Sequence, residues 1–303
     1  PAVTLAEFSP RAGQSWPLAP GLRLVLAPNA SPMTERGTNT YILGEGAVTV
    51  IDPGPADPAH LAAISAALHP GERISQILVT HAHLDHSPAA APLSAQTGAP
   101  VLAFGDARAG RSRRMAALSG GDLGGGEGVD TGFAPHERLA DGVTLEAGGQ
   151  VLTAIHTPGH FGNHLCFQWG GALFSGDHVM GWAPSLVSPP DGDLTDFMAS
   201  LDRIEALGAL AYYPGHGAPI EEGAARVRAL RAHRRGREEA IRAALRDGAR
   251  SLGAITDRVY TDVPPALLPA AARNVLAHLI DLQARNLARF DGPPGPQTPV
   301  FPA

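Results

Sequence analysis

The sequence lacks the residues that build disulfides and cysteine-rich metal sites. Its 303 residues include a single cysteine, Cys166, which excludes a disulfide within the chain and a zinc site of the multi-cysteine kind. Lysine is absent, so all 23 basic residues are arginine. No segment approaches the roughly 18 to 20 consecutive apolar residues of a membrane-spanning helix. The first ten residues hold no basic stretch followed by an apolar run, so we expect a cytoplasmic protein that does not enter a membrane.

The composition is that of a folded protein with a substantial core. Hydrophobic residues make up 44% of the chain and charged residues 17%, so the chain can bury a core without disulfides. Its length suits one large domain and a smaller one. The net charge is −6, but residues 226–250 form a local positive surface. The nine arginines of that segment are Arg226, Arg228, Arg231, Arg234, Arg235, Arg237, Arg242, Arg246 and Arg250.

Short strands and helices alternate through the first two thirds of the chain. Residues 22–52 contain three apolar stretches, each ended by Asn, Gly or Pro, a pattern that predicts a β-sheet at the start of the fold. Beyond them the pattern predicts helices at 57–68, 88–97 and 194–207 and strands at 75–80, 101–104, 151–155, 164–169, 172–175 and 209–214. The expected fold class is therefore α/β.

Two segments depart from this alternation. Residues 106–142 are rich in glycine, and a loop of this length is usually functional or mobile. It is either a lid over a site or a surface insertion. Beyond residue 223 the strands are expected to stop, and three helical patterns follow at 223–246, 251–260 and 269–288. We therefore place a domain boundary between residues 222 and 223.

Four potential metal ligands lie together in the sequence THAHLDH, directly after the predicted strand 75–80. They are His81, His83, Asp85 and His86. Active sites of α/β folds favour the carboxyl ends of strands, and imidazole with carboxylate is a donor set that zinc prefers. By itself the cluster could also be an incidental tract of surface histidines.

Three further ligand types recur at the same kind of place. His160 in HTPGH, Asp177 in FSGDH and His216 in YPGHG each follow a predicted strand at a glycine turn. Glycine allows the close backbone approach that a compact metal site needs. The recurrence favours a metal site over an incidental tract.

The order HxHxDH, then a single His, Asp and His, resembles the pattern of the metallo-β-lactamase superfamily. The resemblance implies a four-layer αββα sandwich over roughly residues 15–222, with the site at one edge of the two sheets. Residues 1–222 would then be the hydrolase domain. Position by position, the resemblance implies His81, His83 and His160 at a first metal site, Asp85, His86 and His216 at a second, and Asp177 as the bridging carboxylate.

The resemblance also implies a hydrolase with two divalent cations, foremost Zn²⁺, although iron or manganese suits the oxygen ligands too. Two such cations about 3.5 to 4 Å apart share a water and lower its pKa from about 15.7 toward 7. Asp85 would orient that water and accept its proton. Members that hydrolyse antibiotics commonly carry a cysteine in place of Asp177, and Cys166 does not align with a ligand, so β-lactam hydrolysis is not expected.

Three residues near these motifs have less certain roles. His164 either contacts substrate or supports a ligand, and His178 would point away from the site if its strand alternates. Asp52 either holds a ligand histidine or caps its own loop. We assign the other histidines to structure or surface: His60, His69, His136, His156, His233 and His278.

The helical pattern at 264–290 and the sequence SLGAITDRVY at 251–260 resemble the winged-helix-like domain of the subgroup typified by lactamase-β-like protein 2, and DLTDFMASLDRI at 193–204 also resembles that subgroup. The resemblance implies such a domain over residues 223–303. That subgroup includes an endoribonuclease for single-stranded RNA, so RNA phosphodiester hydrolysis is one prediction, with the arginines of 226–250 as phosphate contacts. A helix with arginine on its solvated face is the simpler interpretation of that segment. Hydrolysis of a small ester, thioester or lactone is an equally open prediction. A non-catalytic metal-binding partner module is a third.

Overall fold

The computed structural model describes residues 8–208 and 210–303, and its first sheet follows from the apolar strands at the start of the chain. Seven strands pair in chain order, antiparallel from β1 to β4 and parallel from β4 to β7. They are β1 (Ser15–Ala19), β2 (Leu22–Leu26), β3 (Asn39–Leu43), β4 (Ala47–Ile51), β5 (Arg73–Leu78), β6 (Val101–Ala103) and β7 (Glu137–Arg138). The three strands predicted within 22–52 are confirmed, whereas β1 and the two-residue β7 were not predicted.

The second sheet is built from the later strands, in the order β12-β11-β10-β9-β8. All its pairs are antiparallel except β11 with β12. The strands are β8 (Thr144–Ala147), β9 (Gln150–His156), β10 (Leu165–Trp169), β11 (Ala172–Gly176) and β12 (Ala211–Pro214). The strand predicted at 209–214 is confirmed from residue 211, and residue 209 lies outside the described residues.

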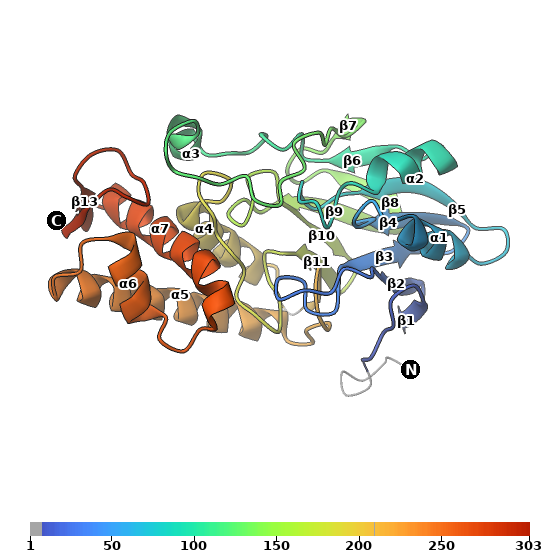
Figure 1. Ribbon diagram of the computed structural model, residues 1–303. Coiled ribbons are helices and arrows are strands. Elements are labelled where there is room, and N and C mark those ends of the chain that lie inside the picture. Colours follow the sequence, from blue (N-terminus) through green and yellow to red (C-terminus); the bar gives the residue numbers. More distant parts are fainter. Residues whose placement is uncertain (1–7, 209) are drawn as a thin grey trace.

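Helices cover the outer face of each sheet (Figure 1). The first sheet packs on α1 (Pro58–Ala66) and α2 (Ala90–Thr97), whose Ile64 and Leu93 are fully buried. The second packs on α4 (Leu194–Glu205) through Phe197 and Leu201. Between the sheets lies a core that includes Tyr41, Phe167 and Phe174. The predicted four-layer αββα sandwich is therefore confirmed.

The glycine-rich segment 106–142 runs between the sandwich and the C-terminal helices. It contains a short helix, α3 (Arg113–Leu118), that was not predicted. Met115 and Leu123 are buried in the core of the C-terminal helices. Near the predicted ligands, the backbone carbonyl of Gly128 accepts a hydrogen bond from the N–H of Leu84 at 2.8 Å. The segment thus lies beside the candidate site rather than away from it.

The C-terminal part contains the three predicted helices, named α5 (Gly223–Arg246), α6 (Leu252–Val259) and α7 (Leu268–Ala284), with a 3-10 turn at Pro265–Leu267. The expectation that strands stop was wrong, because β13 (Ala288–Phe290) and β14 (Val300–Pro302) form an antiparallel hairpin. The helix predicted to reach residue 288 ends at Ala284, and Asn286 follows with a left-handed φ of 57°.

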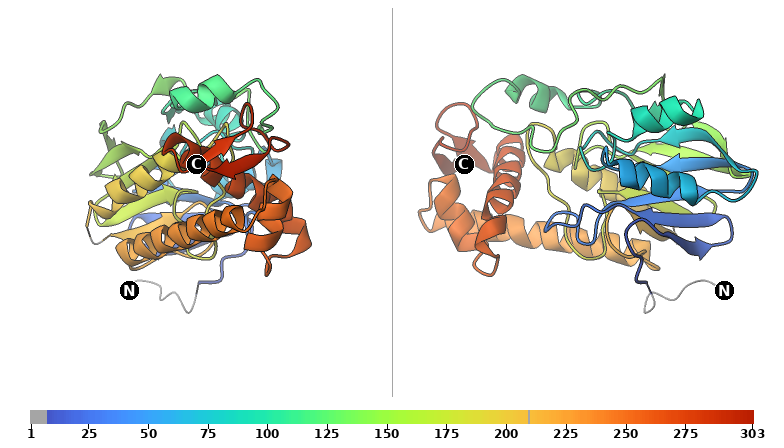
Figure 2. Two further views of the ribbon diagram at one scale, coloured as in Figure 1. Left: turned by 90° about the vertical axis from the view of Figure 1, so that its left-hand side faces the viewer. Right: turned by 45° about the vertical axis from the view of Figure 1, so that its right-hand side comes forward.

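Helix α5 connects the two parts of the molecule (Figure 2). Val227 and Leu230 in its first half pack in the core under α4. Ile241 and Leu245 in its second half pack in the core of α6 and α7. The boundary at residues 222 and 223 stays a prediction. Across the described residues, no helix is both long enough and apolar enough to cross a membrane.

Candidate metal centre

The seven predicted ligands lie in loops that follow strands of both sheets. The HAHLDH loop follows β5 in the first sheet, and the other three ligands follow β9, β11 and β12 in the second. Their donor atoms fall into two groups, each within 4.8 Å: His81, His83 and His160 in one, and Asp85, His86, Asp177 and His216 in the other. Residues up to 135 positions apart in sequence, from His81 to His216, thus meet at one edge of the sandwich.

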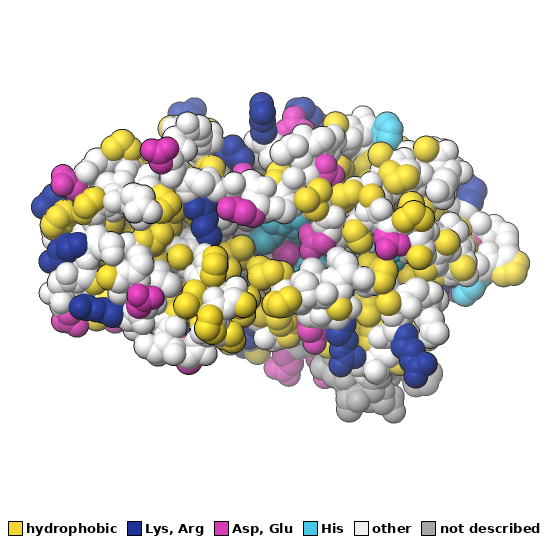
Figure 3. All heavy atoms as spheres, in the orientation of Figure 1, with side chains coloured by type: hydrophobic (Ala, Val, Ile, Leu, Met, Phe, Trp, Pro, Cys, Tyr) yellow, Lys and Arg dark blue, Asp and Glu magenta, His cyan; other side chains and the backbone are white. Residues whose placement is uncertain are grey.

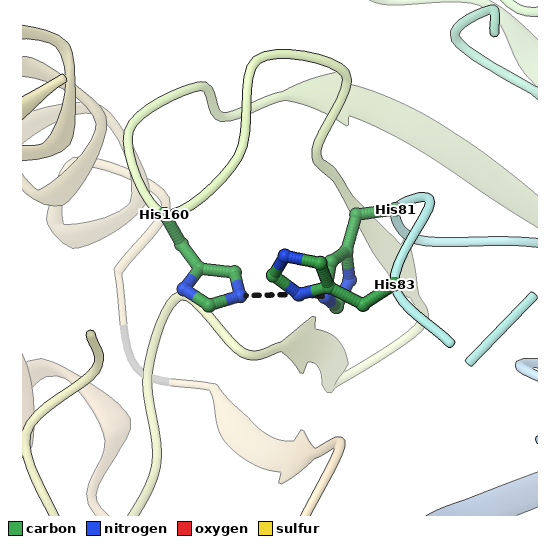
Figure 4. A group of neighbouring side chains, drawn as sticks. All are labelled: His81, His83 and His160. Atoms are coloured by element: carbon green, nitrogen blue, oxygen red, sulfur yellow. Dashed lines mark hydrogen bonds between the residues drawn. The ribbon is translucent and has the colours of Figure 1, made fainter. Parts of the chain in front are cut away.

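The first group consists of three imidazoles that face one another (Figure 4). The Nδ1 atom of His83 lies 2.9 Å from Nε2 of His81 and 3.1 Å from Nε2 of His160. Burial lowers the pKa of His83 to about 3, and nearby His160 adds to this effect. Burial also lowers the pKa values of His81 and His160, so all three rings are neutral and can offer lone pairs to a cation.

The second group combines two imidazoles with two carboxylates. Nε2 of His216 lies 3.3 Å from Nε2 of His86, 3.2 Å from a carboxylate oxygen of Asp85 and 3.3 Å from one of Asp177. The Asp177 carboxylate also lies 3.8 Å from Nε2 of His160, so it stands between the two groups. This is the place that a bridging carboxylate requires.

The electrostatics of the second group favour positive charge. Burial by itself would lower the pKa of His216, but the adjacent Asp177 carboxylate outweighs it and raises that pKa to about 9. Burial by itself would also lower the pKa of His86, but the carboxylates of Asp85 and Asp177 outweigh it and raise that pKa. The carboxyl pKa of Asp177 is held well below its usual range by His216 and His86, against the effect of burial. A bound cation would satisfy the same demand for positive charge.

Backbone carbonyls fix the orientation of two of the predicted ligand rings. Nδ1 of His160 lies 2.7 Å from the carbonyl oxygen of Leu186, and Nδ1 of His216 lies 3.1 Å from that of Gly37. A carbonyl oxygen can only accept, so both Nδ1 atoms donate. In a neutral imidazole the Nε2 atom is then an acceptor, and it points into the site.

Asp52 fixes two more rings. One of its oxygens accepts from His86 Nδ1 at 2.9 Å and from the Thr80 hydroxyl at 2.7 Å. Because that hydroxyl gives its only proton to Asp52, it accepts from Nδ1 of His81, 2.9 Å away. The other Asp52 oxygen accepts from the Thr80 backbone N–H. Asp52 therefore holds a predicted ligand histidine and the start of the HAHLDH loop, whereas its side chain accepts no hydrogen bond from its own loop among the described residues.

The positions of the ring protons show whether these residues suit a metal ion. The inward Nε2 atoms of four histidines are acceptors when the rings are neutral, and they converge on two carboxylates that are also acceptors. One oxygen of Asp177 has no hydrogen-bond partner among the described residues, although it is buried. Buried acceptors gathered without donors are costly. Protonation of His86 and His216, whose pKa values are raised, offsets that cost, and a divalent cation would offset it in their place. The donor set therefore fits a divalent metal.

Gly215 shows how tightly the site is built. A Cβ atom at this position would collide with a carboxylate oxygen of Asp177 and would lie 2.6 Å from Cε1 of His86. Any side chain would displace one of these two residues. The glycine before His216 is therefore required by close approach.

The remaining histidines stay outside both groups. His164 is fully buried, and its Nδ1 lies 2.8 Å from the hydroxyl of Thr157. Its ring centroid lies 5.2 Å from that of His81, so it supports a ligand ring from behind. His178 packs on Phe197 at 4.4 Å.

Two cavities adjoin the centre. One, of about 260 Å³, is lined by His160 and Asp177 together with mostly apolar residues from the loops at 32–33 and 180–186 and from the C-terminal part. The other, of about 230 Å³, is lined by His83 and His160 and by Glu127, Asp191 and Arg273. Figure 3 shows histidine and acidic side chains at the bottom of a hollow, beside a region of hydrophobic side chains. Sequence reasoning did not locate these cavities, because their walls come from distant loops.

Most arginines of residues 226–250 form hydrogen bonds or ion pairs with other groups of the protein. Arg226 donates to the carbonyl of Met180, and Arg237 donates to that of Val259. Arg234 is buried, 2% exposed. Ion pairs engage Arg228 and Arg231 with Glu205, and Arg242 and Arg246 with Glu239. The segment is therefore not an open row of free cations, which a polymer of phosphates would need.

Two protein-family sequence models match the chain. A sequence model described as the metallo-β-lactamase superfamily matches residues 33–216, and one described as a β-lactamase-associated winged helix domain matches residues 251–293.

Three similar proteins cover most of the chain. The β-lactamase-like protein 2 homolog of Caenorhabditis elegans is 31% identical, over 85% of this chain and 82% of its own. An atrochrysone carboxyl ACP thioesterase of Aspergillus fumigatus is 34% identical, over 79% of this chain and 70% of its own. A crystal structure of a metallo-β-lactamase family protein from Thermus thermophilus is 26% identical with a TM-score of 0.73, covering 94% of this chain and 99% of that one.

Proposed function

Because this chain belongs to the metallo-β-lactamase superfamily and is a hydrolase, we propose that it cleaves small acyl thioesters at a centre of two divalent cations, foremost zinc. The observation that carries the proposal is the apolar cavity of about 260 Å³ that shares His160 and Asp177 with the candidate centre. A similar protein from Aspergillus fumigatus is named as an ACP thioesterase. The chain spans 70% of that protein's length.

The cavity walls suit an acyl chain better than a polynucleotide. Met180, Trp182, Leu186 and Val263 are among the lining residues, and apolar walls stabilise an apolar ligand by removing it from water. A nucleic-acid site needs free arginines along a groove, whereas most arginines of residues 226–250 contact the protein itself. Hydrolysis of single-stranded RNA is therefore the less favoured function.

The ligand residues would hold the cations as the sequence predicted. His81, His83 and His160 would bind one, and Asp85, His86 and His216 the other, with Asp177 between them. Divalent cations in such a site polarise the carbonyl of the substrate and make water acidic enough to attack at neutral pH. Zinc suits the imidazole-rich first group, and iron or manganese also suits the carboxylates of the second.

Asp85 has the catalytic role in this proposal. Its side chain is 28% exposed, more than that of Asp177 at 9%, so it can reach a water in the hollow. It would orient that water and accept its proton. The oxygen of water bonds to the thioester carbon, the carbon–sulfur bond breaks, and the thiolate takes up a proton. The products are a carboxylic acid and a thiol.

The test compares two substrates on one metal-loaded preparation. We expect hydrolysis of a simple thioester, such as pentanoyl N-acetylcysteamine, and little of bis(p-nitrophenyl) phosphate. Asp85→Asn should lower kcat by about 10²- to 10⁴-fold, the usual loss for a general base. Asp122→Asn, at an exposed aspartate, serves as the control. Efficient phosphodiester cleavage without thioester cleavage would overturn the proposal.

A further inference from the structure

Two arginines line the apolar cavity without an ion-pair partner. Arg234 and Arg237 both contribute to its wall. Ion pairs among the described residues engage four other arginines of α5 but neither of these two. Asp177 is the one carboxylate among the lining residues, and it belongs to the candidate metal centre. The cavity therefore has positive charge in its wall with no acidic residue of its own to balance it.

The protein holds these guanidinium groups in place but does not neutralise them. Arg234 donates to the side chain of Asn274 at 2.9 Å and to the carbonyl of Ser185, while its Nε has no partner among the described residues. Arg237 donates to the carbonyl of Val259 at 2.5 Å and lies 4.3 Å from the ring centre of Tyr260. All of these partners are neutral.

Holding the buried positive charge of Arg234 beside an apolar cavity is costly, and the half-buried Arg237 adds a second charge next to it. Burial lowers the pKa of Arg234 to about 10. Nearby Tyr260 acts against this shift, whereas the positive charge of Arg237 adds to it. Arg234 therefore stays protonated at neutral pH. A buried charge without a partner destabilises the protein, and a bound anion would offset that cost through charge-assisted hydrogen bonds.

We propose that this cavity binds an apolar chain that carries an anionic group, with the guanidinium of Arg237, supported by Arg234, as the partner of the anion. The inference rests on the proposed thioester hydrolysis and narrows its substrate class. Arginine suits this role because its planar group binds the oxygens of carboxylate or phosphate in pairs.

The anion has two chemical sources in a thioester. It is either a carboxylate at the far end of the acyl group or a phosphate on the thiol that leaves. Two matched pairs of substrates separate them. Pentanoyl and glutaryl N-acetylcysteamine differ only in a terminal methyl or carboxylate. Pentanoyl pantetheine and pentanoyl 4′-phosphopantetheine differ only in the phosphate.

The experiment measures kcat/KM for these four thioesters with the metal-loaded protein. We expect one anionic member to exceed its neutral partner about tenfold, the effect of one charge-assisted hydrogen bond. Arg237→Met should remove that ratio while turnover of the neutral substrates persists, and Arg237→Lys should restore part of it. Arg235→Met is the matched control, because Arg235 lies on the same helix but lines a different cavity and is exposed.

The outcomes separate this inference from the proposed function. Equal kcat/KM within both pairs, or a ratio that Arg237→Met and Arg235→Met leave equally intact, would overturn the anion site while thioester hydrolysis stands. Failure to cleave any of the four would overturn the proposed function.

Binding then tests the anion site without turnover. Thioether analogues of the same four compounds cannot be hydrolysed, and Trp182 in the cavity wall reports their binding by fluorescence. Tighter binding of an anionic analogue that Arg237→Met abolishes supports the site, and equal binding of anionic and neutral analogues overturns it.

Discussion

Asp52 links the first sheet to the predicted metal ligands. It accepts hydrogen bonds from His86 and from Thr80, and Thr80 in turn orients His81. Its φ of 50° is unusual for a residue other than glycine, and such strain persists only where the surroundings hold it. One carboxylate thus sets the orientation of one ring in each ligand group.

Replacing Asp52 should weaken metal binding without removing a ligand. In Asp52→Asn the side chain keeps its size but loses the charge that holds His86 as a donor. Loss of such a supporting partner typically lowers metal affinity about 10- to 100-fold. Titration with zinc in the presence of a competing chelator measures the change, and Asp122→Asn is the control. An unchanged affinity would show that Asp52 does not support the predicted ligands.

His60 makes stability depend on pH away from the metal centre. It is fully buried on α1, and its Nε2 lies 2.8 Å from the hydroxyl of Thr40. Burial lowers its pKa to about 4, below the value of about 6.5 in the unfolded chain. The unfolded state therefore binds more protons between these values.

The free energy of unfolding should accordingly fall as the pH falls from about 6.5 to 4. The loss from His60 is at most about 3.4 kcal/mol. His60→Gln retains a donor to Thr40 but does not titrate, so its stability should fall less over this window. Urea unfolding at several pH values measures the difference. Parallel pH profiles for the two proteins would rule out this role of His60.

At the scale of elements, helix α7 supports the loop that orients His160. Asn274 on α7 accepts from Arg234 of α5 and from the backbone N–H of Val187. The neighbouring residue Leu186 supplies the carbonyl that accepts from His160. The C-terminal helices therefore reach a predicted ligand through one loop.

Asn274→Ala should loosen this loop. The buried Arg234 and the Val187 N–H would each lose an acceptor, at a cost of about 1–3 kcal/mol for an unsatisfied buried group. We expect a lower unfolding free energy and weaker metal binding, measured by urea unfolding and chelator competition. Gln283→Ala, at a half-buried amide on the same helix that lines neither cavity, is the control. Lower stability with unchanged metal affinity would contradict the link to His160.

The elements could be predicted where their pattern was long and regular. The strands of residues 22–52 and the helices at 194–207 and 223–246 have clear apolar spacing, and the structure contains them. The hairpin of β13 and β14 was missed because each strand has three residues within a Pro-rich tail. α3 was not predicted because it has only six residues and lies in a glycine-rich segment, where a helical pattern is too short to recognise.

The proximity of the seven predicted ligands could also be predicted, because each follows a strand at a recognisable motif. The groups that hold these residues in position could not be predicted. The carbonyls of Leu186 and Gly37 carry no sequence signal, since any residue supplies a carbonyl. The apolar cavity was missed for the same reason, because its walls meet only through the packing of α5 and α7 on the sandwich.

At the scale of the whole molecule, the proposed substrate cleft lies between the sandwich and the C-terminal helices. Ala270 on α7 lines both cavities beside the centre. A larger side chain there would narrow the path for substrate without touching a predicted ligand.

Ala270→Phe should therefore raise KM more for long acyl thioesters than for acetyl thioesters, with unchanged metal content. Steady-state kinetics over a series of chain lengths measures this, and Ala272→Phe, at a position on the same helix that lines neither cavity, is the control. A uniform change at every chain length would place the acyl group elsewhere.

The central claim is that side chains from both sheets hold metal ions that activate water. Its most direct test is the metal content of the purified protein after saturation with zinc and removal of excess, measured by elemental analysis. The account predicts about two equivalents per chain, falling toward one in His160→Ala, with thioester hydrolysis lost on chelation and regained on adding metal. A protein that retains no metal, or that hydrolyses thioesters equally well after complete chelation, would contradict it.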